Sequence, residues 1–185
     1  MKKSSLVLVL VLVLEARAHQ APHPKRLLLQ LSPDRITVLV DFTVAGGEPA
    51  RALRQSFDRD RNGRLDDSER ALLAEYLMAT ATLRTRIRGL ELKRAAPPQV
   101  EGEPADSTQP LSIRVALHGG WPEPDWLGRR TLVVEDESPA GAGHVPVSAT
   151  CEGCTISSIS AAEITPTAPL ELKVRLGDSG WSCGR

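Results

Sequence analysis

The sequence predicts an α+β protein: a β-sandwich-like domain of about eight short strands that carries an inserted helix-loop-helix. Three observations lead to this prediction. Short β-rich runs separated by turn residues lie on both sides of residues 48–82. Fourteen Gly and fourteen Pro favour a fold with many turns over a helical bundle. Residues 48–82 themselves show apolar residues at helical spacing on either side of a polar loop.

Residues 1–18 are typical of a secretory signal peptide. Lys2 and Lys3 precede an apolar Leu/Val run at residues 6–14, and residues 16–18 form a small-x-small cleavage pattern. The apolar run is shorter than the roughly 20 residues that span a bilayer. We therefore expect an exported protein, periplasmic or extracellular, that begins at His19 and has no membrane span after cleavage.

Residues 19–47 are predicted to form the first strand pair of the β domain. The runs KRLLLQL and RITVLVDFTV flank a turn that contains Pro33 and Asp34. The second run alternates, so one face carries apolar side chains and the other is mixed. The two faces are Ile36, Val38 and Val40 against Thr37, Leu39 and Asp41.

Residues 48–82 are predicted to form the helical insert. Pro49 suits the first turn of a helix, where its missing N–H costs nothing. The spacing of apolar residues predicts one buried face on each helix. These faces are Ala50, Leu53 and Phe57 in the first helix, and Leu72, Leu73, Tyr76 and Leu77 in the second.

Residues 83–177 are predicted to complete the β domain with six strands, and residues 178–185 to form a loose tail. LRTRIRGLELKR, residues 83–94, is expected to be one strand, and TISSISAAEI, residues 155–164, another. Trp121 and Trp126 lie in the loop GGWPEPDW, where we expect them to anchor the loop in the core. Stacking on a sugar or a peptide is the alternative.

The loop at residues 58–69, DRDRNGRLDDSE, satisfies the pattern D-x-[DN]-x-[DN]-G-x₅-E. Ca²⁺ is a hard ion that takes six to eight oxygen ligands. Alternating polar side chains can turn toward one point as the chain curls, and glycine at the sixth position allows the sharp bend. The predicted ligands are Asp58, Asp60, Asn62, Arg64 through its carbonyl, Asp66 and Glu69.

Residues 49–78, which include this loop and both helices, resemble the EF-hand family. The resemblance implies a bidentate Glu69, which favours Ca²⁺ over Mg²⁺. It also implies that Leu65, at the eighth loop position, joins a backbone pairing with a second hand, and the sequence contains only one hand. A lone hand needs support from the β domain, from a protein partner or from self-association. We expect a structural or stability-sensing calcium site.

The cysteines allow several interpretations. Cys151 and Cys154, in CEGC, resemble a redox or zinc half-site, for which His144 is a nearby candidate ligand. The flanking residues are strand-like instead of helical, so we favour a structural disulfide across a hairpin. Cys183 is then left over.

An alternative function is periplasmic metal handling or redox chemistry through His19 or the Cys151/Cys154 pair. An N-terminal His19 could chelate copper with a second histidine, His118 or His144. The order of signal peptide, strands and helical insert also resembles, more weakly, the exported head regions of bacterial metal-transport membrane proteins.

The composition and the absence of certain motifs argue against other classes of function. The 23 basic and 23 acidic residues balance, so we expect no nucleic-acid partner. The aromatic share of 3% leaves the core to Leu, Val, Ile and Ala. Because no arrangement typical of a catalytic triad is present in a suitable context, we expect that the protein is not an enzyme.

Overall fold

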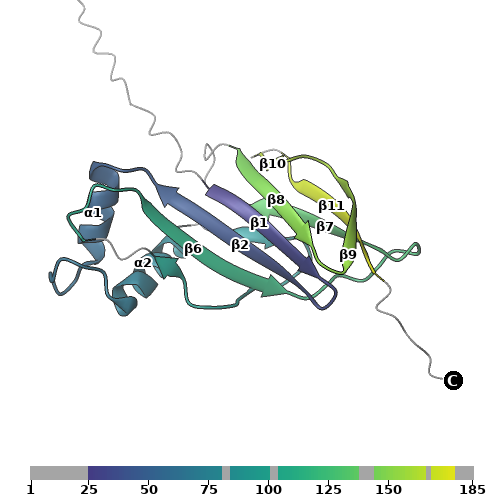
Figure 1. The fold of residues 1–185 in the computed structure, drawn as a ribbon, viewed down its shortest axis with the longest axis horizontal. Coiled ribbons are helices and arrows are strands. Elements are labelled where there is room, and N and C mark those ends of the chain that lie inside the picture. The colour runs from purple at the N-terminus through teal and green to yellow at the C-terminus, as the bar shows by residue number, and fades with distance from the viewer. Residues whose placement is uncertain (1–24, 81–83, 101–103, 138–143, 166–167, 178–185) are drawn as a thin grey trace, which may run out of the picture.

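The structure is a computed structural model, and it describes residues 25–80, 84–100, 104–137, 144–165 and 168–177. Most of this part of the chain is β structure arranged in two sheets, with two helices, which confirms the predicted α+β class (Figure 1). The elements are β1 (Lys25–Ser32), β2 (Arg35–Val44), α1 (Glu48–Phe57), α2 (Asp67–Ala79), β3 (Thr85–Ile87), β4 (Lys93–Arg94), β5 (Gln99–Val100), β6 (Leu111–Gly119), β7 (Arg129–Asp136), β8 (Val145–Cys151), β9 (Cys154–Ile159), β10 (Glu163–Ile164) and β11 (Leu170–Leu176).

The larger sheet has the strand order β10-β8-β1-β2-β6-β4, with β5 also paired to β6. β1 and β2 form the predicted antiparallel hairpin, in which Ser32 pairs with Arg35. β2 pairs along its length with β6, while β8 lies parallel to β1. The smaller sheet, β3-β7-β11-β9, is antiparallel throughout.

The core follows from the alternation of side chains along the longest strands. In β2 the predicted inner residues Ile36, Val38 and Val40 are fully buried, and the alternate residues between them are only partly buried. β1, β6, β7 and β11 alternate in the same way. Because one face of each strand is apolar, the inner faces of both sheets join one buried cluster.

A buried ion pair links the two sheets where β1 begins. The Lys25 ammonium donates to the carboxylate of Asp136 at the end of β7. It also donates to the carbonyl of Arg84, at 2.8 Å. Burial lowers the pKa of Lys25, and the adjacent Asp136 carboxylate opposes that shift.

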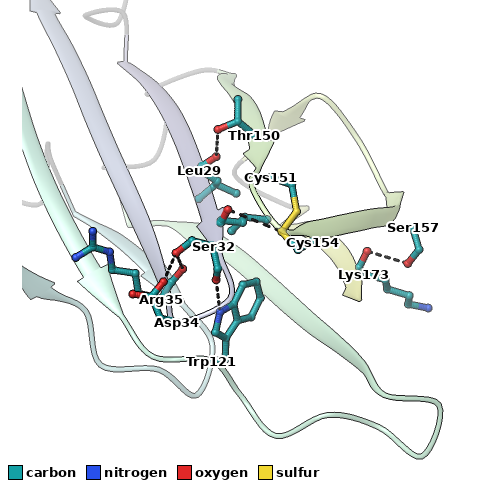
Figure 2. The surroundings of a disulfide bond; sticks show 11 residues. Leu29, Ser32, Asp34, Arg35, Trp121, Thr150, Cys151, Cys154, Ser157 and Lys173 are labelled. Atoms are coloured by element: carbon teal, nitrogen blue, oxygen red, sulfur yellow. Dashed lines mark hydrogen bonds between the residues drawn. A yellow bond between two sulfur atoms is a disulfide. The ribbon is translucent and has the colours of Figure 1, made fainter. Parts of the chain in front are cut away.

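The chain crosses from the larger sheet to the smaller at residues 152–153, where a disulfide joins Cys151 to Cys154 (Figure 2). The Cα atoms of the two cysteines are 5.5 Å apart, a usual span for this bond. The predicted disulfide is therefore present, but the predicted hairpin is wrong. β8 pairs with β1 and β9 pairs with β11, so the bond closes a corner between the two sheets.

Two segments that were each predicted to form one continuous strand are also divided between the two sheets. Of the predicted strand at residues 83–94, the described residues 84–94 hold β3 in the smaller sheet and β4 in the larger, on either side of a turn at Gly89, whose φ is 75°. Residues 155–164 are likewise divided between β9 and β10, which belong to different sheets. The described residues hold eleven strands instead of about eight, because two predicted strands divide between the sheets and β5 forms outside the predicted strands, paired with β6.

The helices α1 and α2 lie together at one end of the larger sheet (Figure 1). In α1, Ala50 is buried and Leu53 and Phe57 pack against the core, as predicted. In α2 the predicted stripe is partly wrong, because Tyr76 is 51% exposed and Ala74 is buried instead. No helix in the part of the chain described here is long and apolar enough to cross a membrane.

Candidate metal centre

The loop between α1 and α2 brings three carboxylates together. Asp58 follows the last residue of α1, Asp60 lies in the loop, and Glu69 lies in the first turn of α2. One ligand oxygen from each side chain lies within 4.8 Å of the others. This is the kind of convergence that the spacing of the loop predicted for a cation site.

Glu69 is the most buried member of the cluster, with only 3% of its surface exposed. One carboxylate oxygen, Oε1, accepts the backbone N–H of Arg59 at 2.6 Å. The other, Oε2, accepts the N–H of Asp66 at 3.0 Å, and Asp66 in turn caps the Glu69 N–H at 2.9 Å. This reciprocal capping box fixes the carboxylate between the loop and α2.

Asp58 supplies the observation that best fits a cation site. Its Oδ2 accepts the backbone N–H of Gly63 at 3.0 Å. Its Oδ1 is shielded from solvent and has no hydrogen-bond partner. A buried carboxylate oxygen without a partner costs free energy, and an ion coordinated by Asp58 and Glu69 would remove that cost.

The other predicted ligands take part in the turn. Asp60 accepts the N–H of Asn62 at 3.0 Å, and Asn62 Oδ1 accepts the N–H of Arg64 at 2.8 Å. Asp66 lies outside the three-carboxylate group, and its side chain caps α2. The backbone N–H of Glu69 holds the pKa of the Asp66 carboxyl below its usual value.

The loop backbone bends through two residues in the left-handed region. Gly63 has a φ of 83° and Arg61 a φ of 57°. Glycine adopts this conformation without the steric cost of a Cβ, which explains the residue type at position 63. The sequence pattern predicted the bend at Gly63 but gave no signal for Arg61.

The β domain holds the loop through a backbone contact that the sequence analysis missed. Ala105 donates its N–H to the carbonyl of Gly63 at 2.7 Å, and Arg64 forms an antiparallel bridge with Pro104. Leu65, the residue expected to pair with a second hand, is 1% exposed. No local pattern identifies residues 104–105 as a partner, because the contact joins segments about forty residues apart.

Arg54 attaches α1 to the same segment of the β domain. Its side chain is fully buried. Its guanidinium donates to the carbonyls of Ser107, Gln109 and Pro110 at 2.8–3.0 Å. The helix and the loop that follows it are therefore both joined to residues 104–110, the segment that leads into β6.

Of the residues of the alternative metal or redox site, Cys151 and Cys154 are brought together, whereas His19 lies outside the described residues. Cys151 and Cys154 form a disulfide at the ends of two strands. The ring of His144 lies 2.7 Å from a carboxylate oxygen of Glu163. The predicted signal peptide, His19, Cys183 and the predicted tail lie outside the described residues.

The two loop tryptophans differ in burial. The indole N–H of Trp121 donates to the carbonyl of Ser32 at 2.7 Å, and the ring packs against the core, as predicted (Figure 2). Trp126 is 88% exposed, so the prediction that it would anchor the loop in the core is wrong.

In the comparisons with known proteins, no protein-family model and no curated protein matched the chain.

Proposed function

We propose that this protein is exported and binds one Ca²⁺ in the loop of residues 58–69, an EF-hand-like site carried on a β-sandwich-like domain. The observation that carries the proposal is the convergence of Asp58, Asp60 and Glu69, together with the buried, unpartnered Oδ1 of Asp58. Three ionised carboxylates this close repel one another, and a divalent cation relieves both the repulsion and the desolvation of Asp58.

The ligand chemistry favours calcium over magnesium. Every predicted ligand atom is an oxygen, and Glu69 is long enough to bind through both carboxylate oxygens. Mg²⁺ demands a smaller octahedron and keeps several waters, whereas Ca²⁺ accepts a larger and less regular set of ligands. An ionised carboxylate has about four lone-pair sites, so the backbone N–H bonds to Glu69 and Asp58 leave sites for a divalent ion.

A structural role is favoured because the loop is already joined to the β domain. The backbone edge next to Leu65 pairs with Pro104 and Ala105 of the same chain, instead of remaining open for a second hand. An ion that rigidifies residues 58–69 therefore stabilises the junction between α1, α2 and the β domain. This arrangement supports a stability-linked site over self-association through the loop.

Export is supported by two features. Residues 1–18 have the composition of a signal peptide, and the Cys151–Cys154 disulfide suits an oxidising compartment. Calcium outside the cell is abundant, so a site with a dissociation constant of about 10⁻⁴–10⁻³ M would be occupied there.

Isothermal titration with Ca²⁺ tests the proposal directly. We expect one ion per chain for the wild type, and no binding for the double variant Asp58→Ala/Glu69→Gln. Asp67→Asn is the matched control, because Asp67 is an acid beside the site whose side chain is fully exposed. Equal binding by the double variant and the control would refute the assigned site.

A further inference from the structure

The loop between β6 and β7 presents two apolar side chains to solvent. Four large apolar side chains are exposed among the residues that the structure describes, and Trp126 and Leu127 are two of them, at 88% and 38%. The loop extends beyond the strands at the end of the molecule opposite α1 and α2 (Figure 1). We call residues 125–128 the β6–β7 tip.

The tip is held in one conformation by its own hydrogen bonds. Asp125 accepts the N–H of Leu127 at 2.9 Å and that of Arg129 at 2.8 Å through Oδ1. The N–H of Gly128 donates to the carbonyl of Asp125 at 2.9 Å. Gly128, with φ 71°, takes the left-handed position of the turn. A pre-formed turn presents Trp126 with little ordering cost on binding.

A basic groove adjoins the tip on the outer face of the smaller sheet. It has a volume of about 600 Å³ and contains three cations and three hydroxyls. Arg129 and Arg175 occupy directly opposed positions on β7 and β11. Like charges in that arrangement destabilise a sheet unless an anion lies near them. The lining residues are Arg129, Thr155, Ser157, Ser158, Lys173 and Arg175.

Arg129 connects the two features, because its Nε donates to Asp125 of the tip at 2.9 Å. The acids that sequence or strand pairing places beside these cations are Glu123 and Asp125 before Arg129, Glu171 before Lys173, and Glu152, which precedes the Cys154–Leu176 pair next to Arg175. Asp125 is engaged by Arg129, and Glu171 lies 3.6 Å from the Lys173 ammonium. Arg175 therefore adds a positive charge to a groove whose other cations are partly compensated.

We propose that the protein docks peripherally on anionic lipid surfaces through this end. Trp126 and Leu127 enter the headgroup layer, where tryptophan is the preferred side chain. Lys173 and Arg175 contact lipid phosphates. The convex tip and the Trp–Leu pair favour a lipid surface over a glycan, because stacking on a sugar uses the aromatic ring and leaves the exposed leucine without a role.

Sedimentation of the full chain with vesicles tests the proposal. We expect binding to vesicles of phosphatidylglycerol and phosphatidylcholine, no binding to phosphatidylcholine alone, and weaker binding as the salt concentration rises. Trp126→Ala should lower the partition coefficient about tenfold. Arg175→Gln should lower it about fivefold. Tyr76→Ala, which removes a half-exposed aromatic ring at the opposite end, should bind as the wild type does.

Acyl-chain-brominated lipids add a direct readout. They should quench the tryptophan fluorescence of the wild type and leave that of Trp126→Phe largely unquenched. Leu127→Ala provides a second tip variant if Trp126→Ala does not fold.

Three results would overturn the proposal: no sedimentation with anionic vesicles, tip variants that bind like the wild type, or a groove that binds inorganic phosphate or a soluble acidic polysaccharide while vesicles do not bind. Adding a chelator should not change vesicle binding, since the proposed calcium site lies at the other end of the molecule (Figure 1).

Discussion

The buried guanidinium of Arg54 supplies the hydrogen bonds that join α1 to residues 107–110. It donates to three backbone carbonyls of residues 107–110, and the fully buried guanidinium has these carbonyls as its partners. We predict that Arg54→Met lowers the free energy of unfolding by about 3 kcal/mol, because Met fills similar space and donates nothing. Urea unfolding measures this effect. Arg51→Met is the control, since Arg51 pairs only with an exposed Glu48. Equal midpoints for both variants would contradict the assignment.

Gly63 allows the bend of the candidate metal loop, because its φ is 83°. A Cβ at this position meets no atom within 4 Å, so the cost of Gly63→Ala is purely conformational. We predict a loss of about 1–2 kcal/mol from the left-handed φ, seen as lower stability and weaker calcium binding. Gly120 also has open space around it but no positive φ. Gly120→Ala should therefore have little effect in the same calorimetric titration and urea unfolding.

The pairing of β3 with β7 is reinforced by charge. Arg86 and Arg88 both donate hydrogen bonds to the Glu135 carboxylate. These bonds hold the pKa of Glu135 below its ordinary value of 4.5, and the bond from Arg88 has the larger effect. A depressed carboxyl pKa adds stability above pH 4.5, and that stability is lost as the pH falls through the folded-state pKa.

This pairing predicts a difference in acid stability. The difference in the free energy of unfolding between the wild type and Glu135→Gln should be present at pH 6 and should shrink as the pH falls below 4.5, through the lowered folded-state pKa. Urea unfolding across this range measures it, and a gap that is independent of pH would exclude the mechanism.

The corner between β8 and β9 depends on the Cys151–Cys154 disulfide. The bond closes a loop of only four residues, so the chain-entropy model gives about 2 kcal/mol of stabilisation. We predict that the double variant Cys151→Ser/Cys154→Ser has a free energy of unfolding lower by about 2 kcal/mol, measured by urea unfolding. A reductant should produce the same shift in the wild type and none in the double variant. A wild type indifferent to reductant would contradict this role.

The local elements were predictable where a repeating pattern determines them. The alternation in β2 predicted that Ile36, Val38 and Val40 face the core, and the loop spacing predicted that Asp58, Asp60 and Glu69 converge. The two contiguous strand runs that divide between sheets were not predictable. A segment carries the same alternation whether its ends join one sheet or two, and only long-range pairing decides between them.

The pairing of Gly63 with Ala105 escaped prediction for a related reason. Residues 94–110 are rich in Pro, Gly and acidic residues, and nothing local in them signals a partner for the candidate metal loop. Tyr76 differs from the prediction because Phe57 covers one side of its ring, at 5.5 Å between centroids, without removing it from solvent. Helical spacing identifies a face, and tertiary contacts determine how far that face is buried.

At the scale of the molecule, the proposed calcium site and the β6–β7 tip lie at opposite ends of the β domain (Figure 1). Residues 104–110 hold both α1 and the metal loop through Arg54 and Gly63, so calcium should stabilise this whole end. Because these contacts lead directly into β6, the central account predicts that ion binding raises the stability of the β domain as a unit.

Thermal unfolding of chelator-stripped protein, with and without calcium, tests that account most directly. At a calcium concentration about twenty times the dissociation constant, we predict about 2 kcal/mol of stabilisation. For a chain of this size that corresponds to a rise in Tm of about 4–8 °C. The rise should be retained in Asp67→Asn and absent in Glu69→Gln. An unchanged Tm for the wild type in millimolar calcium would contradict the proposed site.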